Sequence, residues 1–203
     1  AVTGVQTCAL PIYSDYSMCA RFRVPSTIAS LATNPGIIGI GPTATSASGN
    51  GTVRLICLST GELSVRFVDG SGVTTYANVQ AFLARYAGQV VDVVVARKRY
   101  IQTGDASALT IYINGKPVSY TGNPNHAGVS VTSTYMHVGV GGASDAVWPR
   151  PIYRAALFNR YLSQSDCEYM SMYGMHPADE WSPTSPDLIS STVLNGGFET
   201  AGA

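Results

Sequence analysis

Apolar and polar residues alternate with a period of two along several short segments of the chain. In residues 16–24, Met18, Ala20, Phe22 and Val24 share one face, and serine, cysteine and arginine side chains share the other. The same alternation runs through residues 52–58, 62–68, 89–97, 109–113, 116–120, 135–140 and 152–158. Each of these segments predicts a β-strand with one face in a core.

Turn-forming residues separate the predicted strands. Asn114 and Gly115 tolerate positive φ at both central positions of a turn, so they predict a type I′ hairpin. Residues 59–61 and 69–72 are typical of further turns, while residues 79–88 fit either a short helix or a covering loop. Short strands without alternating long helices predict an all-β fold, a sandwich in one domain of this 203-residue chain.

One helix is predicted directly after the last strand of the sandwich. Ser163 suits the N-cap position, and Asp166, three residues further on, fits the reciprocal partner of a capping box. Residues 164–173 then follow a helical pattern, which directs Cys167 and Met170 toward the sheet.

The two ends of the chain differ in character from the predicted domain. Residues 2–12 match the translation of a common short-read sequencing adapter, so residues 1–12 are interpreted as a non-native segment and left out of the fold prediction. The domain is assigned to 13–176. Residues 177–194 are rich in proline and irregular, as in a linker, and residues 195–203 resemble the start of a further, truncated module.

Cysteine and charge content narrow the classes of function. Outside the adapter-like segment, Cys19, Cys57 and Cys167 are an odd number of distant cysteines, which predicts free thiols rather than a disulfide framework or a zinc site. Twelve Lys and Arg balance twelve Asp and Glu. The absence of a basic stripe argues against nucleic acid as a partner. The absence of a long apolar run argues against a membrane partner.

Four segments in order resemble the concanavalin A-like lectin and glucanase superfamily, especially its laminin-G-like branch: residues 16–26, 62–72, 109–120 and 153–174. The resemblance implies a jelly roll of two antiparallel sheets. Domains of this kind occur in modular surface proteins and bacteriophage tail proteins, which implies a location on an extracellular surface or a virion. The chain departs from the family pattern at Val91 and Asp92, where a Trp or His is usual, and at Pro151, where a glycine is usual.

The superfamily also contains glycosidases, which need two carboxyl groups about 5 to 9.5 Å apart. Acidic residues here are mostly isolated along the sequence. The pair Asp166 and Glu168 points in different directions on a helix, and the pair Asp179 and Glu180 lies in the linker. The sequence therefore predicts that this domain is not an enzyme. The isolated histidines are interpreted as structural or solvated: His126, His137 and His176.

A binding site is predicted in the loop before the final strand. Asp145 and Trp148 are the expected ligand-binding residues there, because a sugar site pairs an aromatic platform with polar groups. The alternative is that Trp148 caps the edge of the sandwich. No cofactor is expected. A weak calcium site could draw on Asp145 or Asp69, but calcium prefers about 6 to 8 oxygen ligands, and no acidic loop supplies several.

The favoured hypothesis is a non-catalytic module that binds a glycan or cell-surface polysaccharide within a larger surface or phage tail protein. The main alternative is a structural or adhesion domain that binds other protein subunits. An accessory domain of a glycoside hydrolase is the less favoured third hypothesis.

Overall fold

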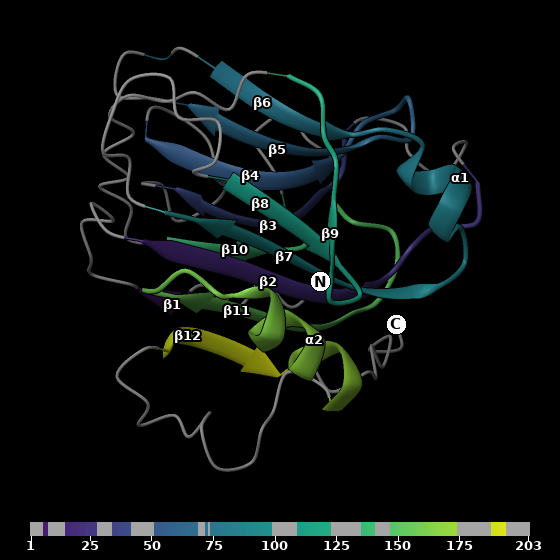
Figure 1. Ribbon diagram of the computed structural model, residues 1–203. Helices are drawn as coiled ribbons and strands as arrows, with labels where there is room; N and C mark the ends of the chain where they lie inside the picture. The colour runs from purple at the N-terminus through teal and green to yellow at the C-terminus, as the bar shows by residue number, and fades with distance from the viewer. Residues whose placement is uncertain are drawn as a thin grey trace, which may run out of the picture.

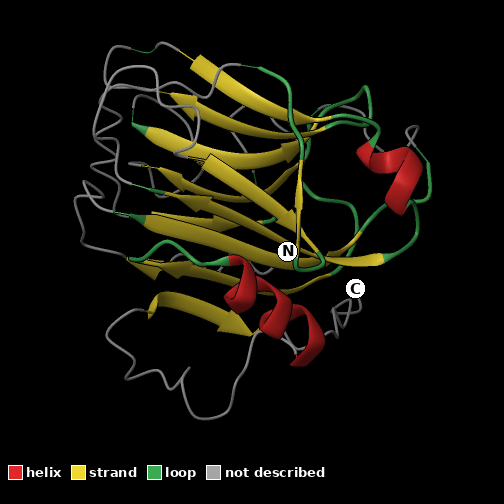
Figure 2. Cartoon of the chain, viewed as in Figure 1, coloured by secondary structure: helices red, strands yellow, loops and turns green. Residues whose placement is uncertain are grey.

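The structure is a computed structural model, and it describes residues 6–7, 15–27, 34–41, 51–68, 72, 74–98, 109–122, 135–140, 147–173 and 188–193. Two antiparallel sheets of six strands each stack face to face (Figure 1). Strands dominate, and two short helices lie outside the sheets (Figure 2). The predicted all-β jelly-roll sandwich is therefore confirmed.

Sheet I has the strand order β1-β10-β3-β4-β5-β6. Its strands are β1 (Gln6–Thr7), β10 (Tyr135–Val138), β3 (Gly36–Gly41), β4 (Thr52–Cys57), β5 (Leu63–Val68) and β6 (Thr74–Val79). Sheet II has the order β12-β11-β2-β7-β8-β9. Its strands are β12 (Leu188–Val193), β11 (Ile152–Phe158), β2 (Tyr16–Arg23), β7 (Val90–Arg97), β8 (Leu109–Ile113) and β9 (Lys116–Val118). The helices are α1 (Phe82–Tyr86) and α2 (Gln164–Tyr173).

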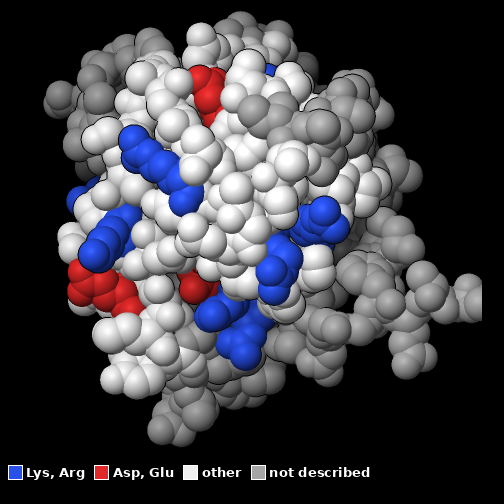
Figure 3. All heavy atoms as spheres, turned by 90° about the vertical axis from the view of Figure 1, so that its right-hand side faces the viewer, with Lys and Arg blue, Asp and Glu red and all other residues white. Residues whose placement is uncertain are grey.

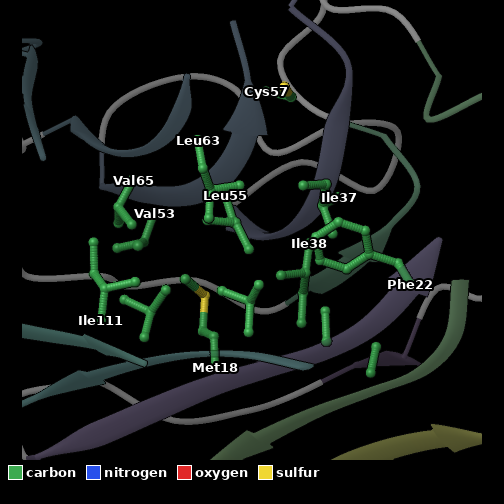
Figure 4. Packing of buried hydrophobic residues seen from close by; sticks show 14 of the residues in the cluster. Met18, Phe22, Ile37, Ile38, Val53, Leu55, Cys57, Leu63, Val65 and Ile111 are labelled. Carbon is green, nitrogen blue, oxygen red and sulfur yellow. The ribbon is translucent and has the colours of Figure 1, made fainter. Parts of the chain in front are cut away.

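The main core lies between the inner faces of the two sheets (Figure 4). Met18 and Phe22 of β2 point into it, as their alternation predicts, and Leu55 and Val65 meet them from sheet I. Alternation fixes which side chains are inside, because successive side chains of a strand point to opposite faces. The residues between them, among them all the arginines of β4 and β5, therefore face outward.

Helix α2 covers the outer face of sheet II through a second apolar cluster. The cluster consists of Cys19, Val94, Ala96, Tyr112, Ala156, Phe158, Leu162, Cys167 and Met170. The β8–β9 turn has φ of 51° at Asn114 and 77° at Gly115, so the predicted pair of positive φ values is confirmed. A Cβ on Gly115 would lie 2.8 Å from the Cα of Glu168, so only glycine lets the turn pack this closely against α2.

The capping box of α2 is complete. The Asp166 amide donates to the Ser163 Oγ at 3.2 Å, and the Ser163 amide donates to the Asp166 Oδ2 at 2.7 Å. Burial raises the pKa of the Asp166 carboxyl, but hydrogen bonds from Ser163 and the charge of Arg160, 3.3 Å away, outweigh it and hold the pKa below its ordinary value. The predicted start of the helix is confirmed.

The three cysteines outside the adapter-like segment are free and buried, as predicted. Burial raises the pKa of the Cys57 thiol to about 12. The pKa of Cys167 is raised to about 12 as well, by burial and by the carboxylate of Asp166. Thiols held protonated in this way act as small apolar side chains rather than as nucleophiles.

Four segments differ from the expectation or extend it. Residues 188–193, expected within the linker, form β12 and pair with β11. Residues 74–79, for which no strand was predicted, form β6 at the edge of sheet I. Within the adapter-like segment, Gln6 and Thr7 pair with β10, and the interpretation of that segment as non-native stays a prediction. The undecided residues 79–88 contain α1.

Sheet II carries one buried carboxylate on its outer face. Asp92 lies opposite Arg21 in the register of β2 and β7, and the Arg21 Nη1 is 3.4 Å from the Asp92 Oδ2. Burial raises the pKa of Asp92 to about 6, against the opposing charges of Arg21 and Arg154. On the face shown in Figure 3, the basic side chains form separate groups, some of them beside acidic side chains, rather than a continuous stripe.

Replacing Ser163 tests the cap. Ser163→Ala should lower the free energy of unfolding by about 1 kcal/mol, because the Asp166 amide loses its acceptor. Chemical denaturation followed by circular dichroism measures the change. Ser171→Ala, within the same helix, is the matched control and should leave stability within about 0.5 kcal/mol. Equal effects of the two substitutions would show that Ser163 has no capping role.

The buried carboxylate predicts a pH dependence of stability. Because the pKa of Asp92 is raised from 3.8 to about 6 in the folded state, the folded protein binds more protons than the unfolded chain between these pH values. The free energy of unfolding should therefore fall as pH rises from 4 to 6, by on the order of 2 kcal/mol from this residue.

Asp92→Asn should remove that component of the pH dependence, whereas Glu168→Gln, on the exposed side of α2, should retain it. Denaturation curves recorded across pH 4–7 measure the difference. Identical pH profiles for the wild type and Asp92→Asn would rule out a raised pKa at this site.

Candidate functional site

The structure places Trp148 in the interior, with an exposed fraction of 4%. Its indole Nε1–H donates to the carbonyl of Arg23 at 3.2 Å, and its ring meets Phe22 edge to face at a centroid distance of 5.1 Å. The platform role predicted for Trp148 requires an accessible ring, whereas this ring is buried in the main core beside Phe22. Asp145 lies outside the described residues, and its role stays a prediction.

A different row of side chains crosses the outer face of sheet I. Its members are consecutive partners in the registers of five strands: His137, Gly39, Arg54, Arg66 and Tyr76. They face outward because their neighbours along the strands are in the core. His137 thus points away from the face of Met136 and Val138, as its position in the alternation predicts, although it is itself buried.

The centre of the row is a pair of arginines. Arg54 of β4 and Arg66 of β5 are direct partners in the antiparallel register, and both are half-buried. Directly opposite residues in such a pair have Cβ atoms about 4.5–5.5 Å apart. Two arginine side chains therefore leave the sheet from neighbouring positions, with the glycine of β3, Gly39, opposite Arg54 on the other flank.

Tyr76 ends the row as a half-exposed ring, with an exposed fraction of 49%. The segment carrying Gly122 lies against it: a Cβ on Gly122 would stand 2.4 Å from the Tyr76 carbonyl oxygen and 2.9 Å from its ring Cδ2. Two backbone hydrogen bonds between Asn78 and Thr121, of 2.8 and 2.9 Å, hold this segment in place. Gly122 therefore lets the backbone support one side of the ring while part of the ring stays accessible.

Polar side chains continue the face beside the row. The buried Ser64 Oγ donates to the Asn78 Oδ1 at 2.7 Å, and the Asn78 Nδ2 donates to the Glu62 Oε2 at 3.3 Å. This chain of hydrogen bonds fixes the orientation of the amide and the carboxylate. The outer face of sheet I therefore has a second set of ordered polar groups at Ser64, which lies two residues before Arg66 in β5.

The composition of this face fits the binding of a polar ring-shaped molecule. A supported aromatic ring offers apolar contact area, and guanidinium groups offer several donors in a fixed fork. Within the described ranges, Glu62 is the one carboxylate on this face, whereas glycoside hydrolysis needs two. No group of three His, Cys, Asp or Glu side chains suited to a metal ion occurs among the residues that the structure describes, and Asp69 lies outside them.

No protein-family model matches the chain, and no curated protein matches it by sequence. Solved structures share its fold. The binding domain of botulinum neurotoxin serotype D matches 80% of this chain and 37% of its own, at 12% identity and a TM-score of 0.55. A heptameric SAP-like pentraxin from Limulus polyphemus matches 83% of this chain and 75% of its own, at 15% identity and a TM-score of 0.54.

The carbohydrate-binding module CBM40 of the Ruminococcus gnavus IT-sialidase, solved with α2,3-sialyllactose, matches 78% of this chain and 83% of its own. Its identity is 11% and its TM-score is 0.51. At such identities these likenesses establish the jelly-roll fold alone. In the described part of the chain, no helix is both long and apolar enough to cross a bilayer.

The interior position of Trp148 predicts a large loss of stability on truncation. Trp148→Ala should lower the free energy of unfolding by about 3–5 kcal/mol, because it leaves a cavity beside Phe22 and removes the donor to Arg23. Val147→Ala, at the exposed neighbouring position, should change it by less than about 0.5 kcal/mol. Thermal and chemical unfolding measure both. A stability loss below about 1 kcal/mol for Trp148→Ala would contradict the interior placement.

Proposed function

We propose that this domain is a non-catalytic carbohydrate-binding module that holds a saccharide on the outer face of sheet I. The observation that carries the proposal is the cross-strand row in which Arg54, Arg66 and the supported, half-exposed Tyr76 are consecutive partners. The proposed setting is a larger modular surface protein or phage tail protein, with a glycan or cell-surface polysaccharide as the partner.

The row offers the two kinds of contact that sugar recognition uses. A pyranose ring has an apolar face of C–H groups, which packs on an aromatic side chain, and a rim of hydroxyl groups, which accept hydrogen bonds. Tyr76 would supply the first contact, and Arg54 and Arg66 the second. Because Gly122 holds the tyrosine ring from one side, little conformational entropy is lost when a ligand packs on it.

The fold is compatible with this proposal. Structures that share it include binding domains, and the CBM40 domain was solved with α2,3-sialyllactose. The likeness carries no residue of those sites over to this chain. The argument for a binding face therefore rests on the row itself.

A second candidate function is protein–protein assembly, which a different surface favours. The outer side of α2 exposes three large apolar side chains, with exposed fractions of 44% for Tyr169, 70% for Met172 and 65% for Tyr173. Tyr169 and Tyr173 also pack on each other, at a centroid distance of 4.7 Å. Exposed aromatic and methionine side chains are typical of protein interfaces.

Truncating the aromatic side chains separates the two functions. Tyr76→Ala should weaken saccharide binding by about tenfold, because it removes on the order of 1–2 kcal/mol of apolar contact. Tyr169→Ala is the matched control: a tyrosine of similar exposure on the other side of the molecule, which should leave binding unchanged. A glycan array on the wild-type chain selects the ligand, and isothermal titration calorimetry measures the variants.

Two results would contradict the proposal. The first is a wild-type chain that binds no member of the array. The second is binding that Tyr169→Ala weakens and Tyr76→Ala does not, which would place the site on α2.

A further inference from the structure

We infer that the saccharide bound by this domain is acidic, and that Arg54 and Arg66 together hold its carboxylate while Tyr76 packs on its ring. This inference rests on the proposed function and names the class of ligand that the face selects. The ligand class is a uronic or sialic acid within an oligosaccharide, since both present a carboxylate attached to a pyranose ring.

The first argument is the spacing of the two arginines. Neighbouring strands lie about 4.8 Å apart, and Arg54 and Arg66 are direct partners across that distance. A carboxylate has two oxygens that each accept hydrogen bonds, and a guanidinium group matches them in a planar, bidentate arrangement. Two such groups from adjacent strands can converge on one carboxylate.

The second argument is the electrostatic cost of the pair. Like charges directly opposite each other in a sheet are destabilising. An anion placed against both guanidinium groups is attracted by both charges, and because both side chains are half-buried, solvent screens the attraction less than on an open surface. Both arginines also interact with other groups of the protein, and five N–H donors on each guanidinium allow a ligand contact beside those interactions.

The third argument is the arrangement within the row. Tyr76 is the register partner of Arg66, so its ring stands one strand away from the proposed carboxylate position. The carboxylate of an acidic sugar is attached directly to its ring, which requires a ring contact and a charge contact side by side. The carboxylate of Glu62 does not occupy this position, because it accepts a hydrogen bond from Asn78 farther along the face.

Overall charge does not explain a preference for acidic ligands in this chain. The formal net charge is zero, so non-specific attraction of anions to the whole molecule is weak. A preference for acidic sugars would therefore come from a local site, and it should depend on Arg54 and Arg66.

The test compares each acidic oligosaccharide with its carboxyl-reduced counterpart, in which a hydroxymethyl group replaces the carboxylate. The probes are uronic acid and sialic acid oligosaccharides, measured by calorimetry on the full chain. The wild type should bind the acidic member at least tenfold more tightly than the reduced one, because charged hydrogen bonds are lost on reduction.

The variants locate the effect. Arg66→Gln should abolish the preference for the acidic member, and Arg66→Lys should keep part of it, because lysine retains the charge but not the bidentate geometry. Arg85→Gln, an exposed position on α1, removes the same charge elsewhere and should keep the full preference. Thermal unfolding shows whether each variant folds. If Arg66→Gln does not, Arg66→Lys and the comparison of ligands on the wild type decide.

The outcomes distinguish this inference from the proposed function. If the wild type binds acidic and reduced probes equally and Tyr76→Ala loses this binding, the inference is overturned but the proposed binding function is supported. Acidic preference unchanged in Arg66→Gln, or equally strong binding of sulfated sugars that lack a carboxylate, would also overturn the inference. Binding to none of the saccharides would overturn both.

Discussion

The structure depends on one constraint: each strand must bury one side chain in two between the sheets. In β4 and β5 that constraint directs Leu55 and Val65 into the core and leaves Arg54 and Arg66 on the outer face. A shift of one residue in the β4–β5 register would turn one of the two arginines into the core, and burying an unpaired guanidinium group is costly. Core packing sets the β4–β5 register, and the register in turn sets the position of the arginine pair.

The two outer faces of the sandwich resolve that constraint differently. On sheet II the outward positions are largely apolar, and α2 covers them. The cap at Ser163 starts the helix, and Gly115 lets the β8–β9 turn pack closely against it. On sheet I the outward positions are mixed: Arg54, Arg66 and Tyr76 are at least partly exposed, whereas Ile56, Ser64 and His137 are buried. An apolar outer face requires a covering element, and α2 is that element on sheet II.

Local signals were enough to predict the sandwich, the type I′ turn at Asn114 and Gly115, and the start of α2. Each depends on residues close together in the sequence. Residues 74–79 were missed because Tyr76 and Ala77 join a strand whose pairing to β5 is not encoded locally. The arginine pair was missed for a related reason: the alternation in residues 52–58 and 62–68 separates Arg54 and Arg66 from the apolar face, but only the β4–β5 register makes them neighbours.

Trp148 shows how an aromatic residue in a polar loop can mislead. Next to prolines, glycines and an aspartate, its sequence context suits a sugar platform, yet its indole satisfies its one donor on the Arg23 carbonyl and packs on Phe22. Burial of the largest side chain in a core outweighs the preference of its loop for solvent. Tyr76 is the converse case: Gly122 occupies one side of its ring and leaves the rest exposed. The exposure of each ring thus depends on residues distant in the sequence, Arg23 and Phe22 for Trp148 and Gly122 for Tyr76, which no local pattern encodes.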